Sequence, residues 1–382
     1  MSHPFPSLDS LVPLHIQKIQ PYIPSKPDDV LRQMFGCPVI YRLNNNENAL
    51  GPSPKALEAI LAMDPVQSAV YPSGDAYHLR QQLAERFRHS PDSFIVGNGA
   101  NEVIAFVIHA FCQTGDNIIT TDKTFAVYEW VAEFSGYEAR LVPLAADYGY
   151  DDEAMLAAID ARTKIIFICN PNNPTGTYWN VERLRRFLDR VDGRQIVVLD
   201  EAYGEFVGAP DFPNGMELLR EYPNLLVFRT FSKMFALAAL RIGFLAGQEQ
   251  IVDVIRRTCV VYSVNSLAQQ AALGSLIDAE EHVERTRQMV YKARRFLEEE
   301  LSRLGLFYVS GEGNYMMIRL PMSDTLAYRK LMGQGIMVRS MTGFRFPNHI
   351  RVTLGTLPIM EKLVEALQNI LIGQNGGASR KD

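Results

Sequence analysis

The sequence is poor in cysteine, carries little net charge and has no long apolar run. Its four cysteines lie far apart and lack the paired spacing of a metal site, as expected in a reducing compartment. A formal net charge of −5 provides no basic field for nucleic acid or membranes. No apolar run approaches the ~20 residues of a membrane span, and the N-terminus lacks an export pattern. We therefore expect a cytoplasmic protein with no metal site.

What is present is an ordinary globular composition on a long chain. The 382 residues are 47% hydrophobic and 21% charged, which argues against disorder and favours two lobes. From about residue 53 to 260, continuous Ile/Val/Leu runs alternate with helical patterns, which predicts an α/β fold with a mostly parallel sheet covered on both faces. A charged helix at 279–304 then leads to a smaller α+β lobe with short strands near 315–320, 336–339 and 350–354. The expected domains are 51–265 and, together, 1–50 with 266–382.

Three of the apolar runs end in polar residues. The run 164–169 leads into Asn170–Gly176, the run 195–199 into Asp200–Tyr203, and the run from Asn224 into Thr230–Lys233. Open α/β sheets bind ligands at the carboxyl ends of their strands. An amine, a carboxylate, a phenol and an amide at that edge form the set that pyridoxal 5′-phosphate (PLP) requires, since this cofactor uses a Schiff-base lysine and an acid at its pyridine nitrogen.

The chemistry assigns a role to each group. Lys233 lies among apolar residues, and burial lowers the pKa of a lysine so that its amine can attack an aldehyde. Asp200 ends a buried strand and can keep the pyridine nitrogen protonated. The other candidates are Tyr203 and Asn173 for the phenolic oxygen, and Ser232, Arg241 and the helix start at Gly99, Ala100 and Asn101 for the phosphate.

Taken singly, these features have simpler explanations. Asn170–Gly176 is turn chemistry, Gly97–Gly99 reads as a tight turn, and a lysine after a strand is usually solvated. Their order and their shared position after strands make coincidence a poor explanation.

These motifs resemble those of the fold-type I aminotransferases, and most of all the histidinol-phosphate aminotransferases. The resemblance covers about 21–371 and rests on Leu43–Asn48, Gly51–Pro54, Tyr71–Gly74, Asn170–Gly176, Asp200–Tyr203, Thr230–Lys233 and Arg351–Thr356. It implies a large PLP-binding domain with a seven-stranded sheet, a homodimer, and the exchange of an amino group between an amino donor and a 2-oxo acid. It also implies roles for further residues: Phe125 stacks on the cofactor ring, Tyr71 reaches the partner subunit's cofactor phosphate, and Arg351, Arg339, Tyr22 and Asn48 contact substrate.

The chain departs from the family pattern near the substrate end. Ala49 stands where proline is usual, Asn101 where aspartate is common, Lys123-Thr124-Phe125 where Pro-Thr-Tyr is usual, and Ala239 where glycine is usual. These departures leave two alternatives open on the same scaffold: an aminotransferase for aromatic or arginine-like amino acids, and a PLP-dependent lyase, decarboxylase or cyclase. A third alternative, a non-catalytic PLP-binding dimer, is disfavoured because Lys233, Asp200, Tyr203 and Arg241 are all present.

Three arginines near the C-terminus differ in what the sequence predicts for them. Arg339 and Arg351 lie at the ends of apolar strands, where a charge needs a ligand or a buried partner, so an internal salt bridge is the competing interpretation. Arg345 lies in a Gly-Phe-Arg-Phe-Pro segment and is expected to be exposed to solvent, as is His349.

Overall fold

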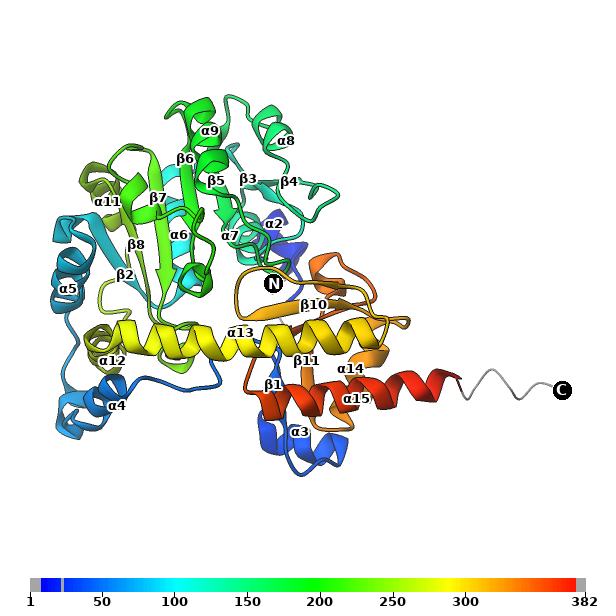
Figure 1. Cartoon of the computed structure of the whole chain (residues 1–382). Helices are drawn as coiled ribbons and strands as arrows, with labels where there is room; N and C mark the ends of the chain where they lie inside the picture. The colour runs from blue at the N-terminus through cyan, green and yellow to red at the C-terminus, as the bar shows by residue number, and fades with distance from the viewer. Residues whose placement is uncertain (1–7, 22–23, 376–382) are drawn as a thin grey trace, which may run out of the picture.

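A twisted sheet of seven strands forms the centre of the larger lobe (Figure 1). The computed structural model describes residues 8–21 and 24–375. The strands, in spatial order, are β2 (Phe94–Gly97), β8 (Gly243–Gly247), β7 (Leu225–Thr230), β6 (Ile196–Asp200), β5 (Thr163–Cys169), β3 (Asn117–Thr121) and β4 (Glu138–Val142). Only β8 runs against its neighbours, because it pairs antiparallel with both β2 and β7. The mostly parallel sheet predicted from the apolar runs is confirmed.

Both faces of this sheet are buried, as the continuous apolar runs require. In β5, Ile165 and Phe167 pack into one hydrophobic cluster, while Ile166 and Ile168 pack into another on the opposite face. The first face is covered by α6 (Ala100–Phe111), α7 (Val127–Phe134) and α11 (Glu249–Arg256). The second is covered by α5 (Tyr77–Phe87), α8 (Asp152–Ala157), α9 (Val181–Val191) and α12 (Ser266–Ile277).

A second sheet of five strands forms the smaller lobe. Its order is β1 (Tyr41–Leu43), β11 (Ile336–Ser340), β12 (His349–Thr353), β10 (Tyr315–Arg319) and β9 (Tyr308–Val309). Three of these strands were predicted. The structure adds the two edge strands, and β1 brings the N-terminal segment into this sheet through parallel pairing with β11.

The long helix α13 (Ala279–Arg303) runs across the molecule from the α4–α12 side to the smaller sheet (Figure 1). The remaining helices are α1 (Leu8–Leu11), α2 (Leu14–Gln17), α3 (Asp28–Phe35), α4 (Pro54–Leu61), α10 (Gly215–Leu218), α14 (Asp324–Met332) and α15 (Leu357–Asn375). Side-chain caps begin several of them: Ser53 Oγ accepts from Ala56 N at the start of α4, and Asn265 Oδ1 accepts from Ala268 N at the start of α12. In the part of the chain that the structure describes, no helix is long and apolar enough to cross a membrane.

The domain boundary at 265/266 stays a prediction. Helix α12 follows that boundary in sequence, but it packs against α4 and α5 of the expected large domain.

Candidate active site

Lys233 lies just after β7, in a partly buried position between the two lobes. Its Nζ donates a hydrogen bond to Asn45 O at 2.7 Å and lies 6.0 Å from the centre of the Tyr203 ring. Burial, and then the positive charges of Arg351 and Arg241, lower the pKa of Lys233 to about 8. An appreciable fraction of this amine is therefore neutral near neutral pH, as attack on an aldehyde requires.

Asp200 ends β6 and is only 2% exposed. Its Oδ2 accepts from the Tyr128 hydroxyl at 2.5 Å, and its Oδ1 accepts from Ala202 N at 2.9 Å. Burial raises the pKa of this carboxyl to about 6, since the pocket provides few charges to offset desolvation. A buried carboxylate that needs a positive partner suits a protonated pyridine nitrogen.

Tyr128 is a site residue that the sequence reasoning missed. It lies on α7 and is fully buried, stacked on Phe167 with the ring centres 4.6 Å apart. Phe125, just before α7, meets Tyr128 edge to face at 5.6 Å. A tyrosine on the apolar face of a helix is usually a core residue. Only its hydrogen bond to Asp200 identifies Tyr128 as part of the site.

Buried side chains from both lobes meet around Tyr203 and Asn173. The Tyr203 hydroxyl accepts from Asn46 Nδ2 at 2.9 Å, and burial raises its pKa to about 12. Asn173 Oδ1 accepts a hydrogen bond from Arg351, which also donates to Asn44 O at 2.8 Å. Lys233, Asp200, Tyr203 and Asn173 thus lie in one region, together with Asn44, Asn45 and Asn46 from the segment after β1, while their roles stay predictions.

The turn between β2 and α6 forms a cradle for an anion. Gly99 precedes the first turn of α6, to which Ala100 and Asn101 belong, and has φ +83°, a conformation that favours glycine. The Arg241 guanidinium lies against Gly99 so closely that a Cβ there would collide with it. A helix N-terminus with a guanidinium beside it binds phosphate well. Ser232 is buried next to Lys233 on the same connection that carries Arg241.

Arg339 and Arg351 lie directly opposite each other on β11 and β12. Both guanidinium groups approach the Phe344 ring, at 5.7 and 5.8 Å from its centre. Neither arginine forms an ion pair with any residue among 8–21 and 24–375, so the internal salt-bridge interpretation finds no support. Burial lowers the pKa of Arg351, and the charge of Arg339 lowers it further. A negatively charged ligand would offset both the burial of this charge and the repulsion between the two guanidinium groups.

The remaining predicted residues have different surroundings. Asn48 is buried, and its amide is hydrogen-bonded inside the protein: Nδ2 donates to Met234 O and Thr286 Oγ1, and Oδ1 accepts from Leu50 N. These bonds tie the Asn48 segment to Met234, the residue after Lys233, and a substrate contact of Asn48 stays a prediction. Tyr71 is 80% exposed and stacks on Tyr262, with the ring centres 4.9 Å apart. Tyr22 lies outside the described residues.

Of the two solvent-facing predictions, the one for His349 needs correction. His349 is buried on β12, because its backbone pairs with β10 and its ring packs beside Phe346. Arg345 is exposed, as predicted, and its guanidinium also pairs with Glu129 of the larger lobe at 2.7 Å.

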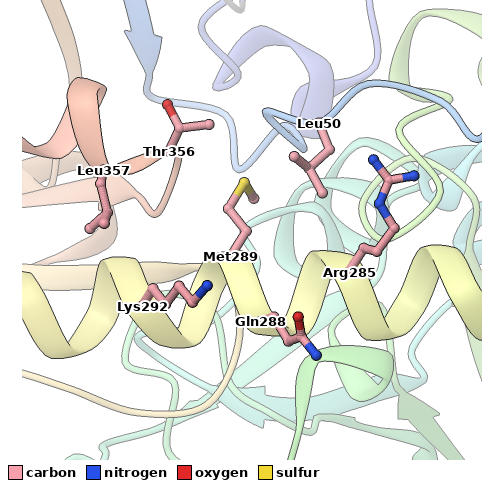
Figure 2. A pocket seen from close by; sticks show the side chains of 7 residues that line it. All are labelled: Leu50, Arg285, Gln288, Met289, Lys292, Thr356 and Leu357. Atoms are coloured by element: carbon pink, nitrogen blue, oxygen red, sulfur yellow. The ribbon is translucent and has the colours of Figure 1, made fainter.

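A cavity of about 360 Å³ lies apart from these residues, between α13, Leu50 and the start of α15 (Figure 2). Its polar lining residues Arg285, Gln288 and Lys292 are all exposed. We assign it no ligand, because none of these polar groups is buried.

Three features of the site fit PLP. The amine of Lys233 has a lowered pKa, the Asp200 carboxylate is buried without a cation, and the cradle at Gly99 and Arg241 suits a phosphate. These three groups match the aldehyde, the pyridine nitrogen and the phosphate of PLP.

Comparison with known proteins gives an independent result. Residues 38–367 match the family model described as aminotransferase class I and II. A histidinol-phosphate aminotransferase 2 from Pseudomonas fluorescens (strain Pf0-1) is 40% identical over 359 residues, which cover 93% of this chain and 96% of that protein. A histidinol-phosphate aminotransferase from Anaeromyxobacter sp. (strain Fw109-5) is 36% identical over 94% of this chain and 99% of its own length.

Solved structures agree with the fold. The crystal structure of histidinol-phosphate aminotransferase from Sinorhizobium meliloti, in complex with pyridoxal-5′-phosphate, superposes with a TM-score of 0.84 at 23% identity, covering 96% of this chain and 98% of that one. The L-threonine-O-3-phosphate decarboxylase from Porphyromonas gingivalis gives 0.77 at 20% identity, covering 87% and 99%. These likenesses concern the fold alone. Because the family model and the relatives cover most of the sequence, the chain belongs to the class I and II aminotransferases and is a PLP-dependent transferase that works between an amino donor and a 2-oxo acid.

Proposed function

We propose that this protein transaminates histidinol phosphate, with a 2-oxo acid such as 2-oxoglutarate as the acceptor. The observation that carries the proposal is the pair Arg339 and Arg351, two neighbouring cations without a carboxylate partner in the described chain. Such a pair suits a substrate with about two negative charges, which a phosphate monoester carries at neutral pH. The names of relatives that are 36–40% identical over more than nine tenths of the chain support the same substrate.

In this proposal Lys233 holds the cofactor and moves protons. When bound, PLP supplies an electron sink for the bonds at the amino-bearing carbon of the substrate. With substrate and cofactor bound, Nζ of Lys233 would accept the proton that leaves the amino-bearing carbon, and the same amine would donate a proton in the reverse direction. The pKa of about 8 suits both directions of this transfer.

Other residues hold and orient the cofactor. Asp200 would keep a proton on the pyridine nitrogen, and Tyr128 holds the Asp200 carboxylate in place at 2.5 Å. Tyr203 and Asn173 would hydrogen-bond the phenolic oxygen, and Phe125 would stack on the ring. The phosphate would be held by Gly99, Ala100, Asn101, Ser232 and Arg241. Arg351 and Arg339 bind the anionic groups of the substrates, and for Tyr22 the family resemblance alone supports a substrate contact.

We further propose that the active enzyme is a cytoplasmic homodimer in which Tyr71 completes the phosphate site of the partner subunit. The 80% exposure of Tyr71, on a surface with exposed Val260, Val261 and Tyr262, supports a partner that covers it. The four cysteines are all free thiols, which supports a reducing compartment.

The test compares substrates and arginine variants. Purified enzyme is mixed with histidinol phosphate and 2-oxoglutarate, and glutamate formation is measured beside parallel reactions with aromatic amino acids and arginine. We expect turnover of histidinol phosphate, competition by millimolar inorganic phosphate, and severe losses in both Arg339→Ala and Arg351→Ala.

Two outcomes would contradict this proposal. No turnover of histidinol phosphate, combined with a harmless Arg339→Ala, would point to a free amino acid substrate. Release of carbon dioxide from one of the amino acids, without formation of glutamate, would point to a decarboxylase, which is one of the alternatives on this scaffold.

A further inference from the structure

Arg345 of the smaller lobe forms an ion pair with α7 of the larger lobe. It lies in the connection between β11 and β12, and therefore between Arg339 and Arg351 in the sequence. Its guanidinium donates two hydrogen bonds to Glu129 on α7, at 2.7 and 3.1 Å, and a third to Asp122 O at 2.7 Å. The carboxylate of Glu129 is only 17% exposed, so this bidentate pair is partly shielded from solvent.

The segment that Arg345 contacts carries cofactor-side residues. Asp122 directly precedes Lys123-Thr124-Phe125, and Glu129 directly follows Tyr128, which holds Asp200. Arg345 therefore connects the part of the smaller lobe that bears the two substrate arginines to the segment that bears Phe125 and Tyr128.

Apolar contacts next to Arg345 support the same junction. Phe346 is buried beside Met317 and Met341 of the smaller lobe, and Tyr148 of the larger lobe packs against it, with the ring centres 6.0 Å apart. Lys123 Nζ lies 5.7 Å from the centre of the Phe346 ring. The junction thus combines one ion pair with an apolar contact, an arrangement that holds two surfaces in one relative position.

We propose that Arg345 and Glu129 are a positioning pair for the transamination: they fix Arg339 and Arg351 at the correct distance from the cofactor-binding segment. This inference rests on the proposed function and deepens it. A partly exposed ion pair is a weak interaction, so its loss is expected to weaken substrate binding without abolishing catalysis.

The experiment uses the holoenzyme and four variants: Arg345→Gln, Glu129→Gln, their double variant, and Arg185→Gln as a control. Arg185 also forms a bidentate pair, with Glu221, on the surface of the larger lobe and away from the site. We expect KM for the phosphorylated donor to rise about two- to fivefold in Arg345→Gln and Glu129→Gln, with little change in kcat. The double variant should resemble the single variants, because each removes the same interaction. Arg185→Gln should match the wild type.

A second measurement is independent of turnover. Trp130 follows Glu129 and is 45% exposed, whereas the second tryptophan, Trp179, is buried. Because Trp130 adjoins Glu129, phosphate that binds at the arginine pair and shifts the Arg345–Glu129 contact should change the Trp130 fluorescence. We expect this response to a titration with inorganic phosphate in the wild type and in Arg185→Gln. In Arg345→Gln it should require higher phosphate concentrations. An Arg345→Gln enzyme with the KM and phosphate response of Arg185→Gln would overturn the positioning role. A wild type that turns over no phosphorylated donor would instead contradict the proposed function, while the phosphate titration would still decide the role of Arg345.

Discussion

At the scale of single residues, desolvation shifts the pKa values of the Lys233 amine and the Asp200 carboxyl group. Burial lowers the pKa of Lys233 to about 8 and raises that of Asp200 to about 6, so both groups move toward their neutral forms. The two shifts have different consequences. The shift of Lys233 prepares a nucleophile, whereas the shift of Asp200 is reversed when a positive partner arrives.

The first prediction concerns the pH at which Lys233 becomes reactive. In the cofactor-free protein, the rate of PLP uptake should rise with pH and reach half its maximum near pH 8, because only the neutral amine attacks. Replacing Arg351 with Gln removes a positive charge that lowers this pKa, so the midpoint should move to higher pH. Arg185→Gln serves as the control and should leave the midpoint unchanged. Absorbance stopped-flow gives the rates, and a midpoint near the ordinary lysine value in the wild type would contradict the prediction.

The lowered pKa of Lys233 also makes the free energy of unfolding depend on pH. Because the folded pKa of Lys233 lies below its unfolded value, the unfolded chain binds more protons between about pH 8 and 10.5. The contribution of this group to the free energy of unfolding of the cofactor-free protein therefore rises with pH across that window.

The second prediction concerns Tyr128, which holds the Asp200 carboxylate. Asp200→Asn should reduce turnover by roughly 10²- to 10³-fold, because it removes a preorganised charge at the pyridine nitrogen. Tyr128→Phe should cost about tenfold, the effect of one hydrogen bond to a charged group. Tyr222→Phe removes a comparable bond to Asp189 at the surface and should be neutral. If Tyr128→Phe were as active as Tyr222→Phe, Tyr128 would be only a core residue.

At the scale of elements, the sequence predicted those segments that have one strong periodic pattern. Asp200 was placed at the end of β6 and Lys233 after β7, because the apolar runs end where these two strands end. Helix α9 was not predicted, although Leu184, Phe187, Leu188 and Val191 have helical spacing and Asn180 caps it. The antiparallel direction of β8 could not be read from the sequence, because an apolar strand has the same composition in either direction.

The third prediction concerns the close crossing of α12 and α4. A Cβ at Gly274 would meet the backbone oxygen of Lys55, which cannot rotate away. Gly274→Ala should gain about 1 kcal/mol from helix propensity but lose about 1–3 kcal/mol from overpacking, so a net destabilisation is expected. The midpoint of urea unfolding should fall, whereas it should not fall in the control Gly208→Ala, where a Cβ meets open space. An unchanged midpoint in Gly274→Ala would mean that the two helices can separate at little cost.

At the scale of the whole molecule, the site exists only because distant segments meet. Arg351 reaches Asn173 and Asn44, and the backbone of Gly176 lies against Gly311 and accepts a hydrogen bond from Glu312 N at 2.7 Å. Arg345 adds the contact with Glu129. Contacts between residues more than a hundred positions apart leave no local pattern in a single sequence. For this reason the Arg345–Glu129 pair and the hydrogen bonds of Asn48 to Met234 and Thr286 were not predicted. The residues that share a motif with known relatives were predicted, because those motifs carry the tertiary information that periodicity lacks.

The fourth prediction is that two defective chains restore one site when they are mixed. Tyr71→Ala should weaken the phosphate site of the partner subunit, and Lys233→Ala should inactivate its own site. In a mixed dimer, the chain that keeps Lys233 receives the intact Tyr71 from its partner, so one of the two sites is complete. Random pairing of equal amounts makes about half of the dimers mixed and should recover about a quarter of wild-type activity. The activity is measured after mild unfolding and refolding of the mixture, with each variant refolded alone as the control. Recovery that stays at the sum of the two separate variants would mean that Tyr71 serves its own chain, and its 80% exposure would then need another explanation.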